Sequence, residues 1–157
     1  MTSGMPWSCS RTYPLTVEDA FDRLLVLPLP DLFAAWYGPI PPIRATVQDG
    51  PWGRVGQQRT VVFAGPGQVH ETLTHLDAPR SFGYRLTDPT GPLALVLSGV
   101  DGVWRVEPAG TGSRITWQWD VRPRGRTGRL AVPMLHTLWN GYARAALDRL
   151  DRLLLAD

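Results

Sequence analysis

Apolar residues recur with two different periods along this chain, and each change of period marks an expected element. A period of two over residues 7–13 predicts a first strand. A helical stripe begins after Thr16, which is a suitable N-cap, and ends before Pro28. Asp31 is expected to cap a second short helix that extends to Trp36. The chain therefore opens with one strand and two short helices.

The period of two returns at Ile43 and persists through six further segments. Short stretches rich in Gly and Pro separate these segments, so neighbouring strands are expected to pair as antiparallel hairpins. The expected strands cover residues 43–48, 57–64, 68–77, 80–88, 93–107 and 113–121. With the first strand, they predict a seven-stranded antiparallel meander.

The last segment shows a helical period again, which predicts one long helix from about Gly128 to Leu154 with Pro133 in its first turn. Its broad apolar face combines Ala131, Met134, Leu135, Leu138, Trp139, Tyr142, Ala145, Ala146, Leu150 and Leu153. A face this wide can be buried only against the concave side of the sheet. The expected fold is α+β, a helix-grip fold in which a curved seven-stranded sheet wraps around the C-terminal helix, in a single domain over residues 1–157.

The composition fits one globular domain and narrows the choice of partners. Hydrophobic residues make up 43% of the 157 residues, and 16 basic against 14 acidic residues give a net charge of +2. No field of one sign is therefore available to hold a polyanion, and nucleic acid is not an expected partner. One basic cluster precedes the last helix and fits solvated loop charge: Arg122, Arg124, Arg126 and Arg129.

The cysteine count and the pattern of apolar stretches favour a cytoplasmic protein. The single Cys9 has no partner for an internal disulfide, and the first ten residues lack a basic and apolar leader pattern. The most apolar stretches are far shorter than the ~20 residues that a spanning helix needs, so stable membrane insertion is not expected. A homodimer is left open.

Pairing the hairpins assigns each side chain to one face of the sheet. The apolar set on the inner face comprises Val61, Phe63, Val69, Leu73, Phe82, Tyr84, Leu86, Trp104, Val106, Ile115, Trp117, Trp119 and Val121. Flat aromatic walls suit a flat apolar ligand. The candidate ligand contacts are therefore Tyr84, Trp104, Trp117 and Trp119 from the sheet, with Leu138 and Tyr142 from the helix. Trp36 and Trp139 are expected to be core residues.

Three polar residues share the inner face, namely Arg59, Glu71 and His75. Arg59 and Glu71 lie about two positions apart on the diagonal between adjacent strands, and a cross-strand ion pair would satisfy both charges. Alternatively, Arg59 grips a carbonyl or carboxylate of a ligand while Glu71 or His75 orients it or moves a proton. His75 lies near a strand end, where a rim residue in contact with water is also expected. No catalytic residue is assigned.

Motifs for metals and nucleotide cofactors are missing from the sequence. The three histidines have no ligand spacing such as HxxxH, so no metal is expected. The chain also lacks a P-loop, a GxGxxG before a helix and a GxSxG elbow. Neither a cofactor nor covalent hydrolysis is therefore expected.

Several short stretches resemble the START-like (SRPBCC) superfamily and, within it, the bacterial polyketide cyclase/dehydrase-like proteins. They are the 17–27 helix, Trp36-Tyr37-Gly38-Pro39, the 53–59 segment, the Glu71 strand, Asp77-Ala78-Pro79 with Phe82-Gly83-Tyr84, and the 104–108 and 112–117 segments. The resemblance covers nearly the whole chain and concerns architecture more than chemistry. It implies that a small apolar or aromatic molecule is held between the sheet and the C-terminal helix, and that only some members catalyse a reaction on it.

Three functions follow as hypotheses. The first is binding of a small hydrophobic ligand, aromatic, polyketide-like or lipid-like. The second is a polyketide aromatase/cyclase or dehydratase that uses general acid/base chemistry in the same cavity, and the third is an interaction module similar to chaperone activators of this fold. An open cavity with Arg59 or Glu71 within reach of a ligand favours the first two, whereas a filled interior favours the third.

Overall fold

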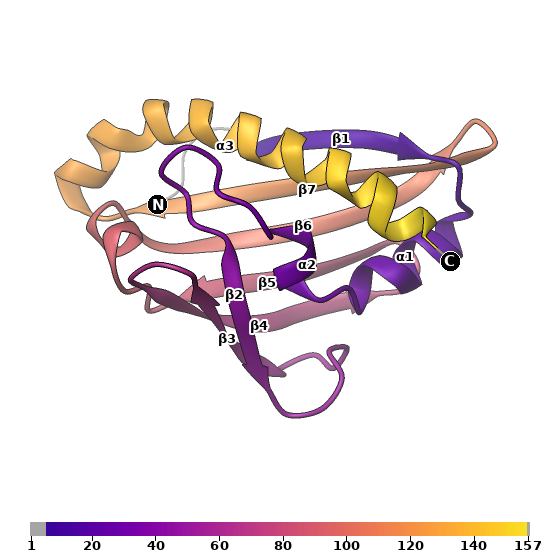
Figure 1. The fold of residues 1–157 in the computed structure, drawn as a ribbon, viewed down its shortest axis with the longest axis horizontal. Helices are drawn as coiled ribbons and strands as arrows, with labels where there is room; N and C mark the ends of the chain where they lie inside the picture. Colours follow the sequence, from indigo (N-terminus) through magenta and orange to yellow (C-terminus); the bar gives the residue numbers. More distant parts are fainter. Residues whose placement is uncertain (1–5, 157) are drawn as a thin grey trace.

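The computed structural model describes residues 6–156, which form one antiparallel sheet with helices packed on one of its faces (Figure 1). The elements are β1 (Trp7–Tyr13), α1 (Val17–Leu25), α2 (Leu29–Leu32), β2 (Ile43–Gln48), β3 (Gln58–Phe63), β4 (Gln68–Asp77), β5 (Ser81–Thr87), η1 (Pro92–Leu95), β6 (Leu97–Ala109), β7 (Gly112–Pro123) and α3 (Gly125–Leu155).

The strands follow the order β1-β7-β6-β5-β4-β3-β2, and every neighbouring pair is antiparallel. The seven-stranded meander expected from the sequence is thus confirmed, with β1 returning beside β7. The long helix α3 runs along β1 and β7, while α1 and α2 cover more of the same face (Figure 1). This arrangement confirms the helix-grip fold, because the apolar side of α3 is buried against the sheet.

The short N-terminal helices differ in how well the sequence predicted them. Helix α1 begins after Thr16 as expected, and the Thr16 hydroxyl accepts a hydrogen bond from the Asp19 backbone N–H at 3.1 Å. Helix α2 covers Leu29–Leu32, so the expectation of a helix from Asp31 to Trp36 was wrong. Pro30 is tolerated in the first turn of α2 because the backbone N–H it lacks has no intrahelical partner there.

Helix α3 starts three residues earlier than expected, and Pro133 therefore lies more than two turns inside it rather than in its first turn. The start is held by the residue between η1 and β6, since the backbone N–H of Arg124 donates to the Val96 carbonyl at 2.8 Å. The buried face of α3 includes Ala143, Leu147 and Leu154, which were not part of the apolar face expected from the sequence. Met134 and Ala145 were expected on that face but are exposed. Within residues 6–156, no helix is both long and apolar enough to cross a membrane.

Charged residues on β6 and β7 pair with one another at the surface. Arg114 and Glu107 pair across the β6–β7 hairpin at 3.5 Å. Of the basic cluster before α3, Arg122 forms an ion pair with Asp101 at 2.6 Å, and the other three arginines are exposed. The basic cluster before α3 therefore lies at the protein surface, as expected from the sequence.

Candidate functional site

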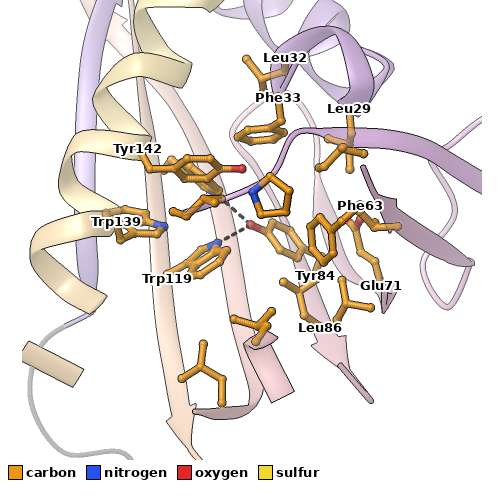
Figure 2. A pocket seen from close by; sticks show the side chains of 18 of the residues that line it. Leu29, Leu32, Phe33, Phe63, Glu71, Tyr84, Leu86, Trp119, Trp139 and Tyr142 are labelled. Carbon is orange, nitrogen blue, oxygen red and sulfur yellow. Dashed lines mark hydrogen bonds between the residues drawn. The ribbon is translucent and has the colours of Figure 1, made fainter. Parts of the chain in front are cut away.

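A cavity of about 430 Å³ lies between the inner face of the sheet and the helices (Figure 2). This volume falls within the ~300–1,000 Å³ that small-molecule sites span. The sheet contributes the rings of Tyr84 and Trp119, and the helical side contributes Phe33, Trp139 and Tyr142. Most other lining side chains are aliphatic, so the cavity is an apolar chamber with few polar groups.

Aromatic rings hold one wall of this cavity in a fixed arrangement. Trp104 and Trp117 are directly opposite each other on β6 and β7, and their rings stack with centroids 4.9 Å apart and an interplanar angle of 5°. Trp117 also contacts Trp139 of α3 at 5.2 Å between centroids. On the helical side, Phe33 stacks on Tyr142 at 5.3 Å. The rings of the sheet and of the helices thus pack against one another around the cavity.

The structure places eight of the nine candidate ligand contacts in the cavity wall. They are Arg59, Glu71, Tyr84, Trp104, Trp117, Trp119, Leu138 and Tyr142. The alternation of side chains along paired strands therefore assigned the inner face correctly for these strands. The stripe of α3 also placed its two candidates on the correct side.

His75 is the exception, and its expected place on the inner face was wrong. A β-bulge in β4 between Leu73 and His75 inserts one extra residue, so the alternation reverses there. His75 then lies opposite Gly83, is exposed, and has its Nε2 atom 3.0 Å from the Ser81 hydroxyl. It does not line the cavity.

Some lining residues were missed by the sequence analysis. Leu24, Leu29, Leu32 and Phe33 enter the wall from α1, α2 and the segment after them. The dense run of leucines from 24 to 32 was the available signal, but periodicity alone does not say which residues face a cavity. The two residues expected in the core both line the cavity: Trp139 is buried, whereas Trp36 is 61% exposed, so the core expectation for Trp36 was wrong.

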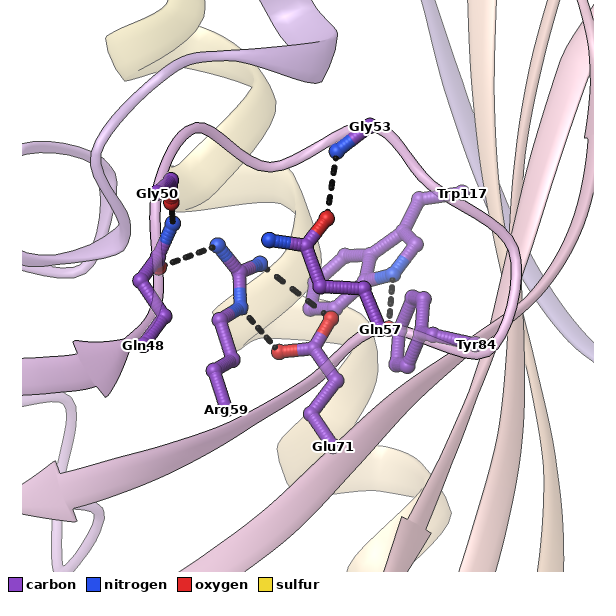
Figure 3. A network of polar contacts seen from close by, with 8 residues as sticks. All are labelled: Gln48, Gly50, Gly53, Gln57, Arg59, Glu71, Tyr84 and Trp117. Carbon is purple, nitrogen blue, oxygen red and sulfur yellow. Dashed lines mark hydrogen bonds and ion pairs between the residues drawn. The ribbon is translucent and has the colours of Figure 1, made fainter.

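Arg59 and Glu71 form the expected ion pair on the concave side of the sheet (Figure 3). They are directly opposite each other on β3 and β4 rather than diagonal. Arg59 Nε lies 2.9 Å from Glu71 Oε1, and Arg59 Nη2 lies 3.2 Å from Oε2. The side chains are only 7% and 5% exposed. Two parallel hydrogen bonds thus compensate both buried charges.

The loop between β2 and β3 completes the surroundings of Arg59. The Gln57 side-chain amide donates to two loop carbonyls at 2.9 and 3.1 Å and accepts from two loop N–H groups at 3.0 and 3.1 Å. This closes the 49–54 segment and places the Trp52 ring against Arg59, whose guanidinium carbon is 3.9 Å from the ring centroid. The guanidinium is therefore committed to a carboxylate and an aromatic face.

Tyr84 has the most heavily used hydroxyl group in the cavity. Its ring lies across Gly102, the residue opposite it on β6, where any Cβ atom would come within 2.1 Å of the ring. From there, the hydroxyl oxygen accepts hydrogen bonds from the indole nitrogens of Trp117 and Trp119, both at 2.8 Å. Burial raises the pKa of Tyr84 above its ordinary value, and the Glu71 carboxylate raises it further.

Tyr142 brings a second phenol into the cavity from α3 (Figure 2). Its hydroxyl makes no hydrogen bond to any residue in the described part of the chain. Burial is the largest cause that raises the pKa of Tyr142, followed by the neighbouring Tyr84. Both phenols therefore stay protonated near neutral pH and act as neutral polar groups in an apolar wall.

The unequal bonding of the two phenols gives a testable difference in stability. Tyr84→Phe should lower the free energy of unfolding by about 1–3 kcal/mol, because two buried indole N–H groups lose their acceptor. Tyr142→Phe should leave the free energy of unfolding nearly unchanged, because its hydroxyl has no partner to lose. Urea denaturation of both variants measures this difference, and equal losses would contradict the assigned hydrogen bonds.

Comparison with known proteins places this cavity in a structural context. The family model for polyketide cyclase/dehydrase and lipid transport proteins matches residues 8–154. Among curated protein sequences, none matches this chain.

Solved structures with the same fold include three at low sequence identity. Ara h 8.0201 is 16% identical with a TM-score of 0.70, over 98% of this chain and 99% of that chain. Norcoclaurine synthase from Thalictrum flavum, in complex with dopamine and hydroxybenzaldehyde, is 18% identical with a TM-score of 0.70, over 98% and 88%. Major latex-like protein 151 from Panax ginseng is 14% identical with a TM-score of 0.64, over 96% and 97%.

These likenesses concern the fold, whereas the family model covers nearly the whole sequence. The match over 8–154 includes every strand except the first residue of β1, and α3 to within one residue of its end. The observed helix-grip fold and the resemblance noted in the sequence lead to the same assignment. The chain belongs to the polyketide cyclase/dehydrase and lipid transport family.

Proposed function

We propose that this protein binds a flat, neutral and largely apolar small molecule in the cavity between its sheet and α3. The observation that carries the proposal is the cavity of about 430 Å³ itself. Protein interiors are normally close-packed, and unfilled volume lowers stability. A chamber of this size behind rigid aromatic walls is therefore better explained as space for a ligand than as a packing defect.

The lining also indicates the charge of the ligand. Arg59 and Glu71 are the only charged residues in the described wall, and they neutralise each other through two hydrogen bonds. An ionic ligand would lose its hydration without gaining a free counter-charge. A neutral aromatic molecule instead gains about 25 cal/mol for each Å² of apolar surface that it buries.

A path from solvent is present at one end of the cavity. Trp36, Pro39 and Pro66 line the cavity and are also exposed, so the chamber reaches the surface between the α2–β2 segment and the β3–β4 turn. Gly65 lies in that turn, where an added Cβ atom would be 3.9 Å from the Trp36 ring. A ligand can therefore enter where the Trp36 side chain lies.

The comparisons support a small molecule as the ligand. The family description joins polyketide cyclases and dehydrases with lipid transport, and the norcoclaurine synthase structure holds dopamine and hydroxybenzaldehyde. An acid/base reaction finds less support, because His75 lies outside the cavity and both carboxylate oxygens of Glu71 accept from Arg59. The proposal therefore assigns no proton transfer to this site.

Ligand binding can be tested with a flat hydrocarbon and a variant that fills the cavity. Fluorene should raise the melting temperature of the protein and change its tryptophan emission, since Trp104, Trp117 and Trp119 line the cavity. Val61→Trp should abolish the rise in melting temperature, because Val61 is a buried lining residue. Val47→Trp on the neighbouring strand β2 is the matched control, since Val47 is exposed and its new ring stays in solvent.

Two results would contradict ligand binding. One is a panel of flat aromatic compounds, polyketides and fatty acids that changes neither the melting temperature nor the emission. The other is equal binding by the Val61→Trp and Val47→Trp variants. A stoichiometric protein complex together with the first result would favour the interaction module.

A further inference from the structure

The Tyr142 hydroxyl is a polar group of the cavity wall that makes no hydrogen bond within the described part of the chain. We propose that it donates a hydrogen bond to an uncharged oxygen of the ligand, which is a flat aromatic compound with a carbonyl or hydroxyl group. This inference rests on the proposed ligand-binding function and names the contact by which the same cavity selects its ligand.

Helix α3 directs the Tyr142 side chain into the cavity. Leu135, Leu138, Trp139 and Tyr142 follow the spacing of one helix face, and all four line the cavity. The Tyr142 ring extends from α3 with its hydroxyl at the far end (Figure 2). Unlike Trp139 Nε1, which is enclosed by its neighbours, the Tyr142 oxygen keeps accessible surface. A ligand atom can therefore reach the Tyr142 hydroxyl from the cavity.

Neighbouring rings hold the Tyr142 side chain in place. Phe33 stacks on it with centroids 5.3 Å apart and an interplanar angle of 14°, and Tyr37 meets it edge-on at 6.2 Å. Tyr37 can approach α3 this closely because Gly141 has no side chain, since any Cβ atom there would collide with the Tyr37 hydroxyl. The Tyr142 hydroxyl thus occupies a fixed position before the ligand binds, which lowers the entropic cost of the contact.

The surroundings of Tyr142 favour an uncharged acceptor. Burial raises the pKa of Tyr142, and the neighbouring Tyr84 raises it further, so the O–H proton is retained near neutral pH. A phenol O–H in an apolar wall lacks the hydrogen bond that water would supply, and a ligand oxygen restores it. A carboxylate is less suitable, because Arg59 is bonded to Glu71 and no free counter-charge remains in the described wall.

The test compares fluorene with fluorenone, two flat molecules of nearly equal size that differ in one carbonyl group. The quantity measured is the ratio of their dissociation constants, because the difference in hydration between the two compounds is the same for every variant of the protein. Tyr142→Phe should change this ratio roughly 3- to 10-fold in favour of fluorene, as expected for the loss of one hydrogen bond in an apolar site. Calorimetric titration gives both constants.

An infrared measurement reports the same contact independently of affinity. The carbonyl stretching band of fluorenone moves to lower frequency when its oxygen accepts a hydrogen bond. The band of bound fluorenone should therefore lie at lower frequency in the unmodified protein than in Tyr142→Phe.

Tyr37→Phe is the matched control. It removes the same group, a hydroxyl that makes no hydrogen bond within the described residues, from a ring that lies beside Tyr142 but outside the cavity wall. Tyr37→Phe should change neither the ratio of dissociation constants nor the carbonyl band. Tyr142→Phe is expected to fold normally, because its hydroxyl has no protein partner to lose.

The outcomes separate this inference from the proposed function. An unchanged ratio or an unchanged band in Tyr142→Phe would overturn the inference while ligand binding stands, because the ligand oxygen would then be held by another group, such as the Tyr84 hydroxyl, or by none. Equal changes in Tyr37→Phe and Tyr142→Phe would also overturn it. Binding of neither compound would overturn both proposals. Changes of the ratio and the band that are confined to Tyr142→Phe support the assignment.

Discussion

Replacing Glu71 with leucine is expected to lower the free energy of unfolding by about 3–5 kcal/mol, because Arg59 is left buried without its counter-charge. The variant Arg59→Met should lower the free energy of unfolding by a similar amount, because the Glu71 carboxylate is then buried without its counter-charge. The double variant Arg59→Met/Glu71→Leu should lose much less than the sum of the two, since no uncompensated charge remains. Urea denaturation of the four proteins measures this coupling.

A surface pair provides the control for this cycle. Arg80 and Asp77 form an ion pair at 2.8 Å, but both side chains are exposed, so Arg80→Met should leave the unfolding midpoint nearly unchanged. Additive losses at Arg59 and Glu71 would show that the two residues do not stabilise each other. That result would leave Arg59 free for the alternative role as a ligand anchor.

The attachment of α3 to the sheet gives the second large effect. Leu150 is 0% exposed, and Leu150→Ala should lower the free energy of unfolding by about 2–5 kcal/mol, since it removes buried methyl groups and leaves a cavity. Leu130 lies on the same helix but is 83% exposed, so Leu130→Ala should change stability by no more than about 0.5 kcal/mol. Thermal and urea unfolding of both variants test which face of α3 is buried.

The expected contrast depends on the helix-grip packing. Similar small effects at both positions would mean that α3 is not held against the sheet. Similar large effects would mean that the N-terminal part of α3, where Leu130 lies, is also buried, for example against another molecule. Sedimentation analysis of the unmodified protein would identify that second case as self-association.

The sequence by itself was sufficient for the sheet and for the side of the cavity wall that the sheet forms. Side chains alternate strictly along a strand, so once the hairpins were paired, Trp104 and Trp117 had to share a face with Tyr84. The same rule placed Arg59 beside Glu71. The apolar width of the last segment required a large partner, and only the sheet offered one.

Local backbone irregularities were beyond the reach of this rule. The bulge before His75 reverses the alternation of side chains, and no residue type at that point predicts a bulge. Trp36 was expected in the core at the end of a helix beginning at Asp31, but α2 ends at Leu32 and Trp36 is 61% exposed. Both errors arise because periodicity assumes an unbroken element.

The polar chemistry of the cavity was decided only by the tertiary structure. That Tyr84 accepts from two indoles depends on the missing side chain at Gly102 and on distances across three strands, none of which a linear pattern contains. The unpartnered N–H of Trp139 depends on the rotation of α3 against the sheet. The sequence thus determined which side chains of the sheet and of α3 face the chamber, because strand and helix periods fix directions, whereas hydrogen bonds between elements require their positions in space.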